Sequence, residues 1–213
     1  MLSYTALGDS ITYGENASSP SHRYVNLASR QAGVKHGGTV LDVVAQPAWT
    51  SGDLTAAVLG NPVCPLRKAS VVTVWIGGND LAFAGLRVLR GAPAASVEAA
   101  LAQYGRNLGA LVTGLKSVCA GRIVLCTQYN PFPNSKVAVE GVAALNAVTA
   151  ETAKRMGVLL APTATAIDGR APELISGYRT GRVEDALRSP ILPVHPNDAG
   201  HRAIAHQLVT FLS

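Results

Sequence analysis

Short runs of apolar, mostly β-branched residues alternate along the chain with segments of helical spacing. The apolar runs lie at 3–7, 39–45, 70–76, 122–128 and 158–161. The segments of helical spacing lie at 24–32, 52–59, 81–89, 96–118, 137–155 and 199–212. Near-continuous hydrophobicity over four to eight residues is typical of strands buried on both faces in a parallel sheet. The alternation predicts an α/β fold, a three-layer α/β/α sandwich around a five-stranded parallel sheet.

The strand order that we expect is 2-1-3-4-5, the common arrangement for five such strands. In this arrangement ligands bind beyond the carboxyl ends of the strands, between strands one and three. The loops 8–14, 46–52 and 77–80 should therefore be neighbours at that edge. The segment 168–194 lacks clear periodicity, and connections of such length are often functional. We expect the functional residues in these four segments.

Composition narrows the class of protein. The chain has 213 residues, of which 48% are hydrophobic and 15% charged, which is enough to form a core in one domain over 1–213. This composition excludes a disordered, fibrous or repeat protein. No apolar stretch approaches the roughly 18 residues that cross a bilayer, and the first residues lack the pattern of an export signal. We expect a cytoplasmic protein without integral membrane association, and secretion would require a signal that precedes this sequence.

Charge and cysteine content exclude several kinds of site. The net charge of +5 comes from single, scattered basic residues, whereas nucleic-acid binding requires clusters of them. A mildly basic solvated surface is the favoured interpretation, and attraction to anionic substrates or lipid surfaces stays open. Cys64, Cys119 and Cys126 are odd in number and lack C-x-x-C spacing, so they indicate neither a zinc site nor a disulfide framework. Cys126 is expected in the core.

Ser10 follows the first predicted strand, where the tight turn at Gly8 and Asp9 can present its hydroxyl at the sheet edge. A serine there is a candidate nucleophile, although Ser10 could instead cap the helix that follows. Acyl transfer through serine also requires a base and donors for the oxyanion. Gly52 and Asn79, which follow the second and third strands, are candidate donors, with an ordinary turn and an Asx-turn as the alternatives.

The base is expected at His195. The other histidines, His22, His36, His201 and His206, lie in helix or loop contexts typical of the surface. His195 has a proline two residues before it and another directly after it. Prolines restrict the backbone on both sides, which suits a positioned base.

Four short strings make the chain resemble the SGNH, or GDSL-type, hydrolases. They are GDSITYG at 8–14, SGD at 51–53, GGND at 77–80 and HPNDAGH at 195–201, in the order of that family. The resemblance implies a flavodoxin-like fold and ester hydrolysis through an acyl-enzyme, with no metal and no organic cofactor. It implies Ser10 as nucleophile and His195 as general base. It also implies an oxyanion hole formed by the amides of Ser10 and Gly52 and the side chain of Asn79.

One departure from the family pattern concerns the triad carboxylate. The family has an aspartate three residues before the histidine, whereas this chain has Leu192 there. Any well-placed acceptor can orient the Nδ1–H of an imidazole, including a backbone carbonyl. We expect the carbonyl of Leu192 to do so, with Asp185 or Glu184 as the alternative acceptor if the loop folds back.

Aromatic residues gather near the predicted site. Those at or just past the carboxyl ends of strands one to four are Tyr13, Trp49, Phe83, Tyr129 and Phe132. They suggest a hydrophobic substrate pocket, with packing under the loops as the alternative for each. Asp9 and Asp80 are expected to organise their turns.

The sequence as a whole favours a serine esterase that acts on small-molecule, lipid or carbohydrate esters of short to medium acyl chain. Acetylated sugars, thioesters and lysophospholipids are alternative substrates. A flavodoxin-like FMN carrier is a weaker hypothesis, in which Ser10, Thr12, Gly14 and Asn16 would hold a phosphate. A binding module without activity is the third, prompted by Leu192. Neither the physiological ester nor the oligomeric state can be inferred from the sequence.

Overall fold

One five-stranded parallel sheet runs through the computed structural model, which describes residues 1–60 and 64–212. The strands are β1 (Leu2–Gly8), β2 (Thr39–Ala45), β3 (Val71–Trp75), β4 (Arg122–Cys126) and β5 (Leu159–Ala161). Their order is β2-β1-β3-β4-β5, and every neighbouring pair is parallel. The predicted α/β class and strand order are confirmed.

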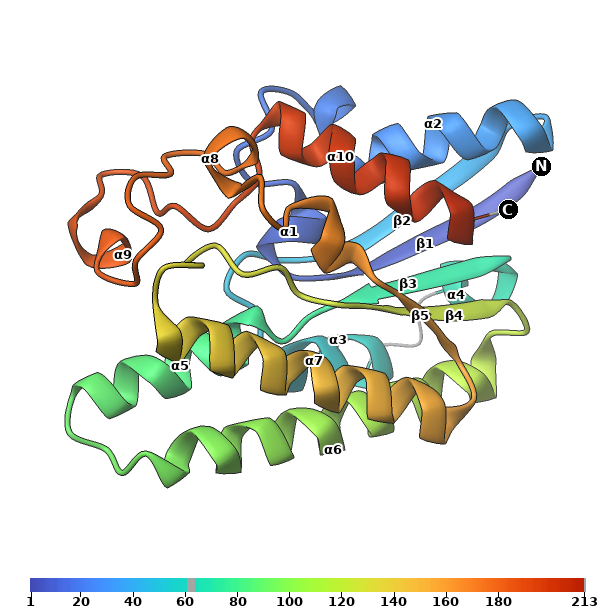
Figure 1. The fold of residues 1–213 in the computed structure, drawn as a ribbon. Helices are drawn as coiled ribbons and strands as arrows, with labels where there is room; N and C mark the ends of the chain where they lie inside the picture. The colour runs from blue at the N-terminus through green and yellow to red at the C-terminus, as the bar shows by residue number, and fades with distance from the viewer. Residues whose placement is uncertain (61–63, 213) are drawn as a thin grey trace.

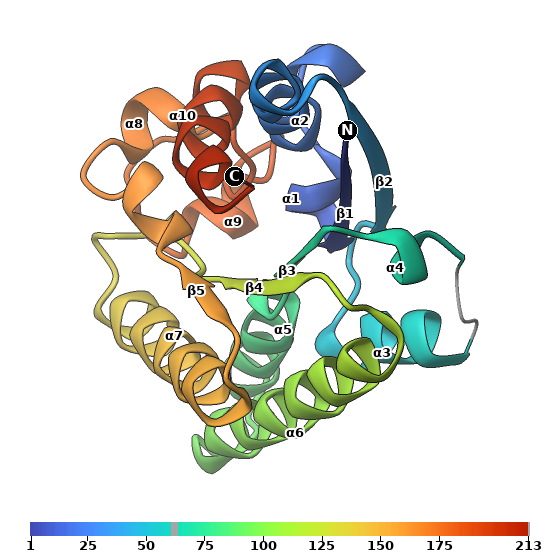
Figure 2. The ribbon, with the colours of Figure 1, turned by 90° about the vertical axis from the view of Figure 1, so that its right-hand side faces the viewer.

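Helices cover both faces of the sheet and make three layers, as Figures 1 and 2 show. One face carries α2 (Tyr24–His36) and α10 (Asp198–Leu208). The other carries α3 (Ser51–Gly60), α5 (Gly78–Leu89), α6 (Ala95–Val118) and α7 (Lys136–Met156). Each long helix matches a predicted segment to within a few residues, because its apolar positions repeat over two or more turns.

The two faces of the sheet bury separate apolar clusters. Beneath α2 and α10, Tyr24 packs against Trp75, and Trp75 meets Tyr129 edge-on. On the other face, the cluster includes Leu54, Leu111 and Leu125, all fully buried. The central strands β1 and β3 are thus buried on both sides, as their sequences predict.

The outer strand β2 departs from the expectation of burial on both faces. Val40 and Val43 keep 49% and 42% of their surface exposed. β2 lies at the edge of the sheet, where among the described strands it pairs with β1 alone, so the helices cover it incompletely. At the opposite edge, Leu159 of β5 is 43% exposed for the same reason.

Several short helices were not expected from the sequence. They are α1 (Ser10–Tyr13), α4 (Cys64–Lys68), α8 (Ala171–Leu174) and α9 (Asp185–Arg188), with the 3-10 turns η1 (Pro20–His22), η2 (Thr163–Ala166) and η3 (Val209–Phe211). Elements of one turn are too short to show a hydrophobic period. The segment 168–194 consequently contains α8 and α9, and the last helix ends at Leu208, where η3 continues the chain.

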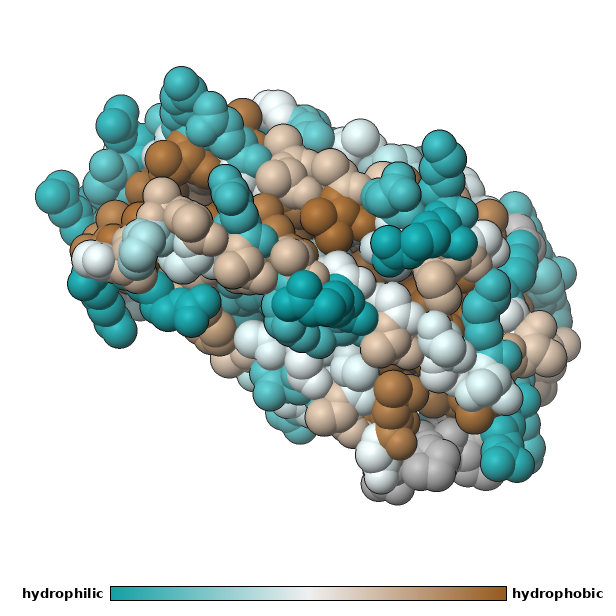
Figure 3. Space-filling view, turned by 90° about the horizontal axis from the view of Figure 1, so that it is seen from below, coloured by the Kyte–Doolittle hydropathy of each residue, from teal (hydrophilic) through white to brown (hydrophobic). Residues whose placement is uncertain are grey.

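The cysteines and the outer surface agree with the expectations from the sequence. Cys119 and Cys126 are buried free thiols, and the side chain of Cys64 lies outside the described part of the structure. No helix in the described ranges is both long and apolar enough to cross a membrane. On the face seen in Figure 3, hydrophilic side chains are scattered among smaller hydrophobic patches rather than gathered in one stripe.

All five strands point their carboxyl ends toward the same end of the molecule, the left-hand end in Figure 1. The loops after β1, β2 and β3 therefore meet there, at the point where the strand order reverses. The segment that contains α8 and α9 lies at that end as well (Figure 1). This arrangement brings together the four segments in which functional residues were expected.

Candidate active site

Ser10 is the first residue of α1, directly after the carboxyl end of β1. Asp9 caps the helix, since its Oδ1 accepts a hydrogen bond of 3.0 Å from the backbone N–H of Ile11. A Cβ at Gly8 would collide with the carbonyl oxygen of Trp75, so this close turn requires glycine. Burial raises the pKa of Asp9 to about 7, against the bond from Ile11. The strand and the cap together fix the position of the serine hydroxyl.

His195 lies against Ser10 although 185 residues separate them in the chain. Its Nε2 is 2.9 Å from Oγ of Ser10. Burial lowers the pKa of His195, and the charge of Glu15 partly opposes that shift. At neutral pH the imidazole is therefore neutral and, with its proton on Nδ1, can accept the hydroxyl proton.

The backbone around His195 is held by hydrogen bonds from two other segments. The N–H of Ser176 donates to the carbonyl of His195 at 2.9 Å. The hydroxyl of Tyr129 donates to the carbonyl of Val194 at 2.6 Å. These bonds, with the two flanking prolines, position the imidazole from the loop after β4 and from the segment after α8.

The two groups expected to orient His195 accept hydrogen bonds from other residues. The carbonyl of Leu192 accepts a hydrogen bond of 2.9 Å from Val194, and the carboxylate of Asp185 accepts bonds from Thr180 and Gly181. Across residues 1–60 and 64–212, no hydrogen bond to Nδ1 of His195 is formed. Asp185 instead closes its own turn before α9, because two neighbouring backbone N–H groups and a hydroxyl satisfy its oxygens.

The three expected oxyanion donors lie on the loops after β1, β2 and β3. The backbone N–H groups of Ser10 and Gly52 donate to no group in the described residues, as is usual in the first turn of a helix. Nδ2 of Asn79 donates to the carbonyl of Trp49 at 2.9 Å, which leaves its second N–H free to bind a ligand. Each of the three loops at this end of the sheet thus offers one donor, as an oxyanion hole would require.

Asp80 ties the second of these loops to the third. Its Oδ2 accepts from the backbone N–H of Ser51 at 2.8 Å, and its Oδ1 accepts from the hydroxyl of Ser51 at 2.6 Å. Nδ2 of Asn107 on α6 donates a second hydrogen bond to that hydroxyl. Burial raises the pKa of Asp80, against the bonds from Ser51. The expected role of Asp80 in organising its turn extends to holding Gly52 beside Asn79.

Glu15 is a site residue that the sequence analysis did not find. It follows Gly14, which ends α1 in the left-handed conformation, and its Oε2 lies 3.2 Å from Nε2 of His195. The sequence gives only a weak signal, a carboxylate directly after the string GDSITYG. Its contact depends on a residue 180 positions away, which no local pattern reveals.

His201, expected at the surface, is fully buried on α10. Its Nδ1 accepts from the backbone N–H of Tyr24 at 3.4 Å, and its Nε2 donates to the carbonyl of Glu15 at 3.2 Å. Burial lowers the pKa of His201 to about 4, so the ring is neutral at physiological pH. The helix period of α10 marks a buried face, but His201 was assigned to the wrong side of it.

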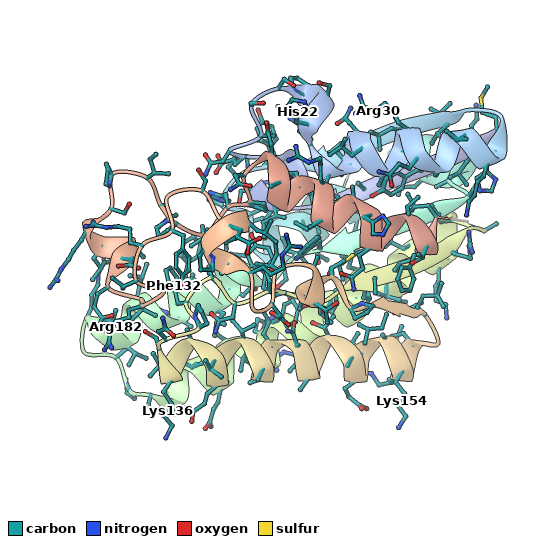
Figure 4. The ribbon with its side chains drawn as sticks, turned by 45° about the horizontal axis from the view of Figure 1, so that its top comes forward. His22, Arg30, Phe132, Lys136, Lys154 and Arg182 are labelled. Carbon is teal, nitrogen blue, oxygen red and sulfur yellow. The ribbon has the colours of Figure 1, made fainter. Side chains whose placement is uncertain are left out.

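Asp198 makes a second connection between α10 and the loop after α1. Its carboxylate accepts from the N–H of Ser18 at 2.8 Å and from the Ser18 hydroxyl at 2.6 Å. His22, labelled in Figure 4 at the end of η1, lies 3.0 Å from the same carboxylate. The loop 14–22 is therefore fastened to the helix that follows His195.

The five aromatic residues expected to line the substrate pocket have different surroundings. Tyr13 and Phe83 are 40% and 44% exposed, while Trp49 and Phe132 are partly buried. Figure 4 places Phe132 near the start of α7, at the same end of the molecule as Arg182. Tyr129 is fully buried and bonds to Val194, so it supports the histidine loop rather than a substrate surface.

A cavity of about 460 Å³ lies between α7 and the chain from η2 to α8. Gln128, Asn146, Asp168 and Tyr178 contribute to its lining, whereas none of the site residues expected from the sequence does so among the described residues. The described side chains also include no cluster of three histidine, cysteine or acidic residues that could hold a metal ion.

Comparisons with known proteins show the family and the fold of the chain. The model of the GDSL-like lipase/acylhydrolase family matches residues 6–203. A lipase from a goat rumen metagenome has the same fold, with a TM-score of 0.82 and 22% identity over 99% of this chain and 97% of its own. No curated protein sequence matches the chain.

Two further solved structures share the fold. An α/β hydrolase from the metagenome of Lake Arreo, Spain, has a TM-score of 0.71 and 21% identity over 99% of this chain and 94% of its own. An acetylxylan esterase from Geobacillus stearothermophilus has a TM-score of 0.73 and 19% identity, covering 100% of this chain and 94% of its own. Because the family model spans nearly the whole chain, this protein belongs to the GDSL-like lipase/acylhydrolase family, a family of carboxylic ester hydrolases.

Proposed function

We propose that the protein hydrolyses carboxylic esters through an acyl-enzyme, with Ser10 as nucleophile and His195 as general base. The observation that carries the proposal is the 2.9 Å contact between Oγ of Ser10 and Nε2 of His195. Variants of the related acetylxylan esterase in which a serine or a histidine is replaced by alanine are described as catalytic mutants, which supports the same pair of residue types.

In the first half of the reaction, Oγ of Ser10 bonds to the ester carbonyl carbon while its proton passes to Nε2 of His195. The carbonyl electron pair moves to the oxygen, where the N–H groups of Ser10, Gly52 and Asn79 stabilise it. Collapse of this intermediate breaks the bond to the alcohol oxygen, which takes the proton from Nε2. Water then repeats the sequence on the acyl-enzyme, releasing the acid and restoring Ser10.

The test is covalent labelling by an active-site-directed phosphonate, together with ester turnover, in the wild type and in Ser10→Ala. We expect the variant to lose both while keeping its fold, because only binding and oxyanion contributions remain. Ser96→Ala is a matched control, since Ser96 bonds to Pro93 at the start of α6, on the surface. Substantial turnover by folded Ser10→Ala would exclude the covalent mechanism.

For the substrate, we propose esters of short to medium acyl chain. Partly exposed apolar side chains near the site, including Phe83 and Leu192, support an apolar acyl contact. A carbohydrate acetylesterase is the second candidate, favoured by the structural similarity to acetylxylan esterase. A series of chromogenic esters from acetyl to palmitoyl, tested beside acetylated xylan and a thioester, separates these substrates through kcat/KM.

The remaining alternatives have less support. A phosphate of FMN would require the hydroxyl of Thr12, but Thr12 is fully buried and bonds to the hydroxyl of Tyr24 at 2.8 Å. An inactive binding module would have no need of the aligned Ser10 and His195 or of unpaired N–H donors beside them. A colourless purified protein that reacts with phosphonate would exclude both.

A further inference from the structure

Two polar side chains contact a single nitrogen of the site. Nε2 of His195 lies 2.9 Å from Oγ of Ser10 and 3.2 Å from Oε2 of Glu15. Ser10 begins α1 and Glu15 follows the glycine that ends it, and the N–H of Glu15 donates to the carbonyl of Ser10 at 3.0 Å. The single turn of α1 thus presents the hydroxyl and the carboxylate to the same edge of the imidazole.

The carboxylate interacts differently with the two protonation states of the ring. When Nε2 carries its lone pair, the carboxylate of Glu15 faces that lone pair, which is unfavourable. When Nε2 has taken the proton of Ser10, it becomes a positively charged N–H donor beside that negative charge, which is a favourable pair. Glu15 therefore favours the imidazolium that exists in the transition state over the neutral base that precedes it.

No other carboxylate contacts the ring within the described residues. Position 192, where the family has its aspartate, is Leu192, and Asp185 is committed to its own turn. Resting on the proposed esterase mechanism, we propose that Glu15 supplies from the Nε2 side of His195 the negative charge that a triad aspartate supplies from the Nδ1 side. It is an electrostatic partner of the base in a serine–histidine site that lacks the usual aspartate.

Hydrogen bonds from α10 hold Glu15 and the residues after it in place. Nε2 of buried His201 donates to the carbonyl of Glu15, and the N–H of Tyr24 satisfies the other ring nitrogen. The bonds between Ser18 and Asp198 hold the following residues of the loop. Both connections reach α10, the helix that begins three residues after His195. The carboxylate of Glu15 and the imidazole of His195 are therefore both positioned by α10.

Other charged groups near the site affect the pH dependence and must be separated from Glu15. Burial raises the pKa of Asp9, and the charges of Asp80 and Glu15 push it in the same direction. On α10, His201 stays neutral at physiological pH because of its burial. Arg23 lies over the ring of Tyr13, beside Gly14. Because Asp9 also responds to the charge of Glu15, the titration of His195 must be read directly from its own ring.

The experiment compares Glu15→Gln, Glu15→Asp and the wild type by two measurements. The first is kcat/KM against pH with a short-chain ester. The second is the pKa of His195 from the NMR signal of its ring, assigned with His195→Ala. Glu140→Gln is the matched control, because Glu140 is an exposed carboxylate on α7 that pairs with Lys136.

For Glu15→Gln we expect the plateau of kcat/KM to fall roughly tenfold or more and the pKa of His195 to fall by about one unit, the low end of the effect of an adjacent opposite charge. Glu15→Asp, which keeps the charge farther away, should recover part of both effects. Glu140→Gln should change neither. Thermal unfolding in each variant shows whether the fold is retained.

A plateau that falls without a shift in the pKa of His195 would overturn the proposal, since Glu15 would then only support the loop. A shifted pKa with an unchanged plateau would overturn it as well. The NMR titration needs no turnover, so its result is independent of Ser10→Ala and phosphonate labelling. Failure of the esterase mechanism and failure of the role of Glu15 are therefore distinguishable.

Discussion

Asp80 binds Ser51 with both oxygens of its carboxylate, at 2.8 Å to the backbone N–H and at 2.6 Å to the hydroxyl. Ser51 is 1% exposed and precedes Gly52, while Asp80 follows Asn79. Each partner is thus the chain neighbour of an expected oxyanion donor. The distance between the two donors is set by a side chain that need not contact the substrate.

Asp80→Asn tests this connection. An asparagine can accept one of the two hydrogen bonds from Ser51, but its amide NH₂ opposes the other donor. We expect kcat to fall about tenfold with a smaller change in KM, and the free energy of unfolding to fall by about 1–2 kcal/mol. Steady-state kinetics and denaturant unfolding provide the two measurements.

The control for this variant is Asp53→Asn. Asp53 lies in the first turn of α3, the helix that begins at Ser51. Its carboxylate bonds to Thr50 and does not reach α5. We expect its kinetics to stay close to those of the wild type. An equal loss of kcat in both variants would mean that any disturbance of α3 impairs the site, and that the bond between Asp80 and Ser51 has no special role.

Asn79→Ala removes the side-chain donor of the proposed oxyanion hole. We expect kcat to fall roughly 10²-fold to 10³-fold with little change in KM, because the full negative charge exists only in the transition state. The comparison of kcat with KM decides the role. A raised KM with steady kcat would identify Asn79 as a residue that binds the substrate in its ground state.

Tyr129→Phe removes the hydroxyl that donates to the carbonyl of Val194, beside His195. This partly buried carbonyl then loses its partner, so the free energy of unfolding should fall by about 1–2 kcal/mol and kcat should fall with it. Tyr178→Phe is a control for stability, since the Tyr178 hydroxyl donates to no described residue. Equal unfolding curves for wild type and Tyr129→Phe would contradict this role.

His201 makes stability depend on pH. Its pKa is about 4 in the folded protein and near 6.5 in the unfolded chain, so between these values the unfolded chain binds a proton that the folded protein does not. The contribution of His201 to the free energy of unfolding is fully present above pH 6.5 and falls by up to about 3 kcal/mol toward pH 4. Asp9, whose folded pKa is raised, acts with the opposite sign in the same range.

His201→Gln separates the two contributions, because Asp9 is present in both proteins. Glutamine can still donate to the carbonyl of Glu15 but does not titrate. We expect the stability difference between wild type and variant to shrink or reverse as the pH falls from 6.5 to 4, measured by denaturant unfolding at each pH. A constant difference over this range would show that His201 keeps an ordinary pKa.

Asp185→Asn tests whether the carboxylate of Asp185 serves His195, and Leu192→Ala tests whether the side chain at position 192 matters. The carboxylate of Asp185 bonds to Thr180 and Gly181, and the carbonyl of Leu192 is unaffected by its side chain. We expect both variants to keep most of their kcat/KM, whereas His195→Ala should lose nearly all of it. A hundredfold loss in folded Asp185→Asn would show that its carboxylate does act on the imidazole.

The parts of this molecule that the sequence predicts are those with a local signal. The strands and long helices repeat a pattern over several residues, and the order of the sheet follows from general rules of α/β topology. Ser10, Gly52, Asn79 and His195 stand in short strings beside those strands. For these reasons the sequence alone indicated the class of fold and the end of the sheet where the site lies.

The parts that the sequence misses depend on distant contacts. Glu15 gains its place only because His195 returns to α1, and His201 is buried because α2 packs on α10. The sequence around Val43 is typical of a strand buried on both faces, yet no strand in the described part of the chain pairs with the outer edge of β2. Leu192 and Asp185 were assigned by their nearness in sequence to His195, which did not predict the directions of their oxygen atoms.

The fastening of the loop 14–22 to α10 also bears on when activity can begin under the proposed mechanism. Ser10 and His195 are 185 positions apart, so the proposed nucleophile is synthesised well before its proposed base. A ribosome-bound chain from which residue 195 has not emerged has the serine without that base. On this mechanism, ester cleavage must wait until His195 has emerged and α10 has docked.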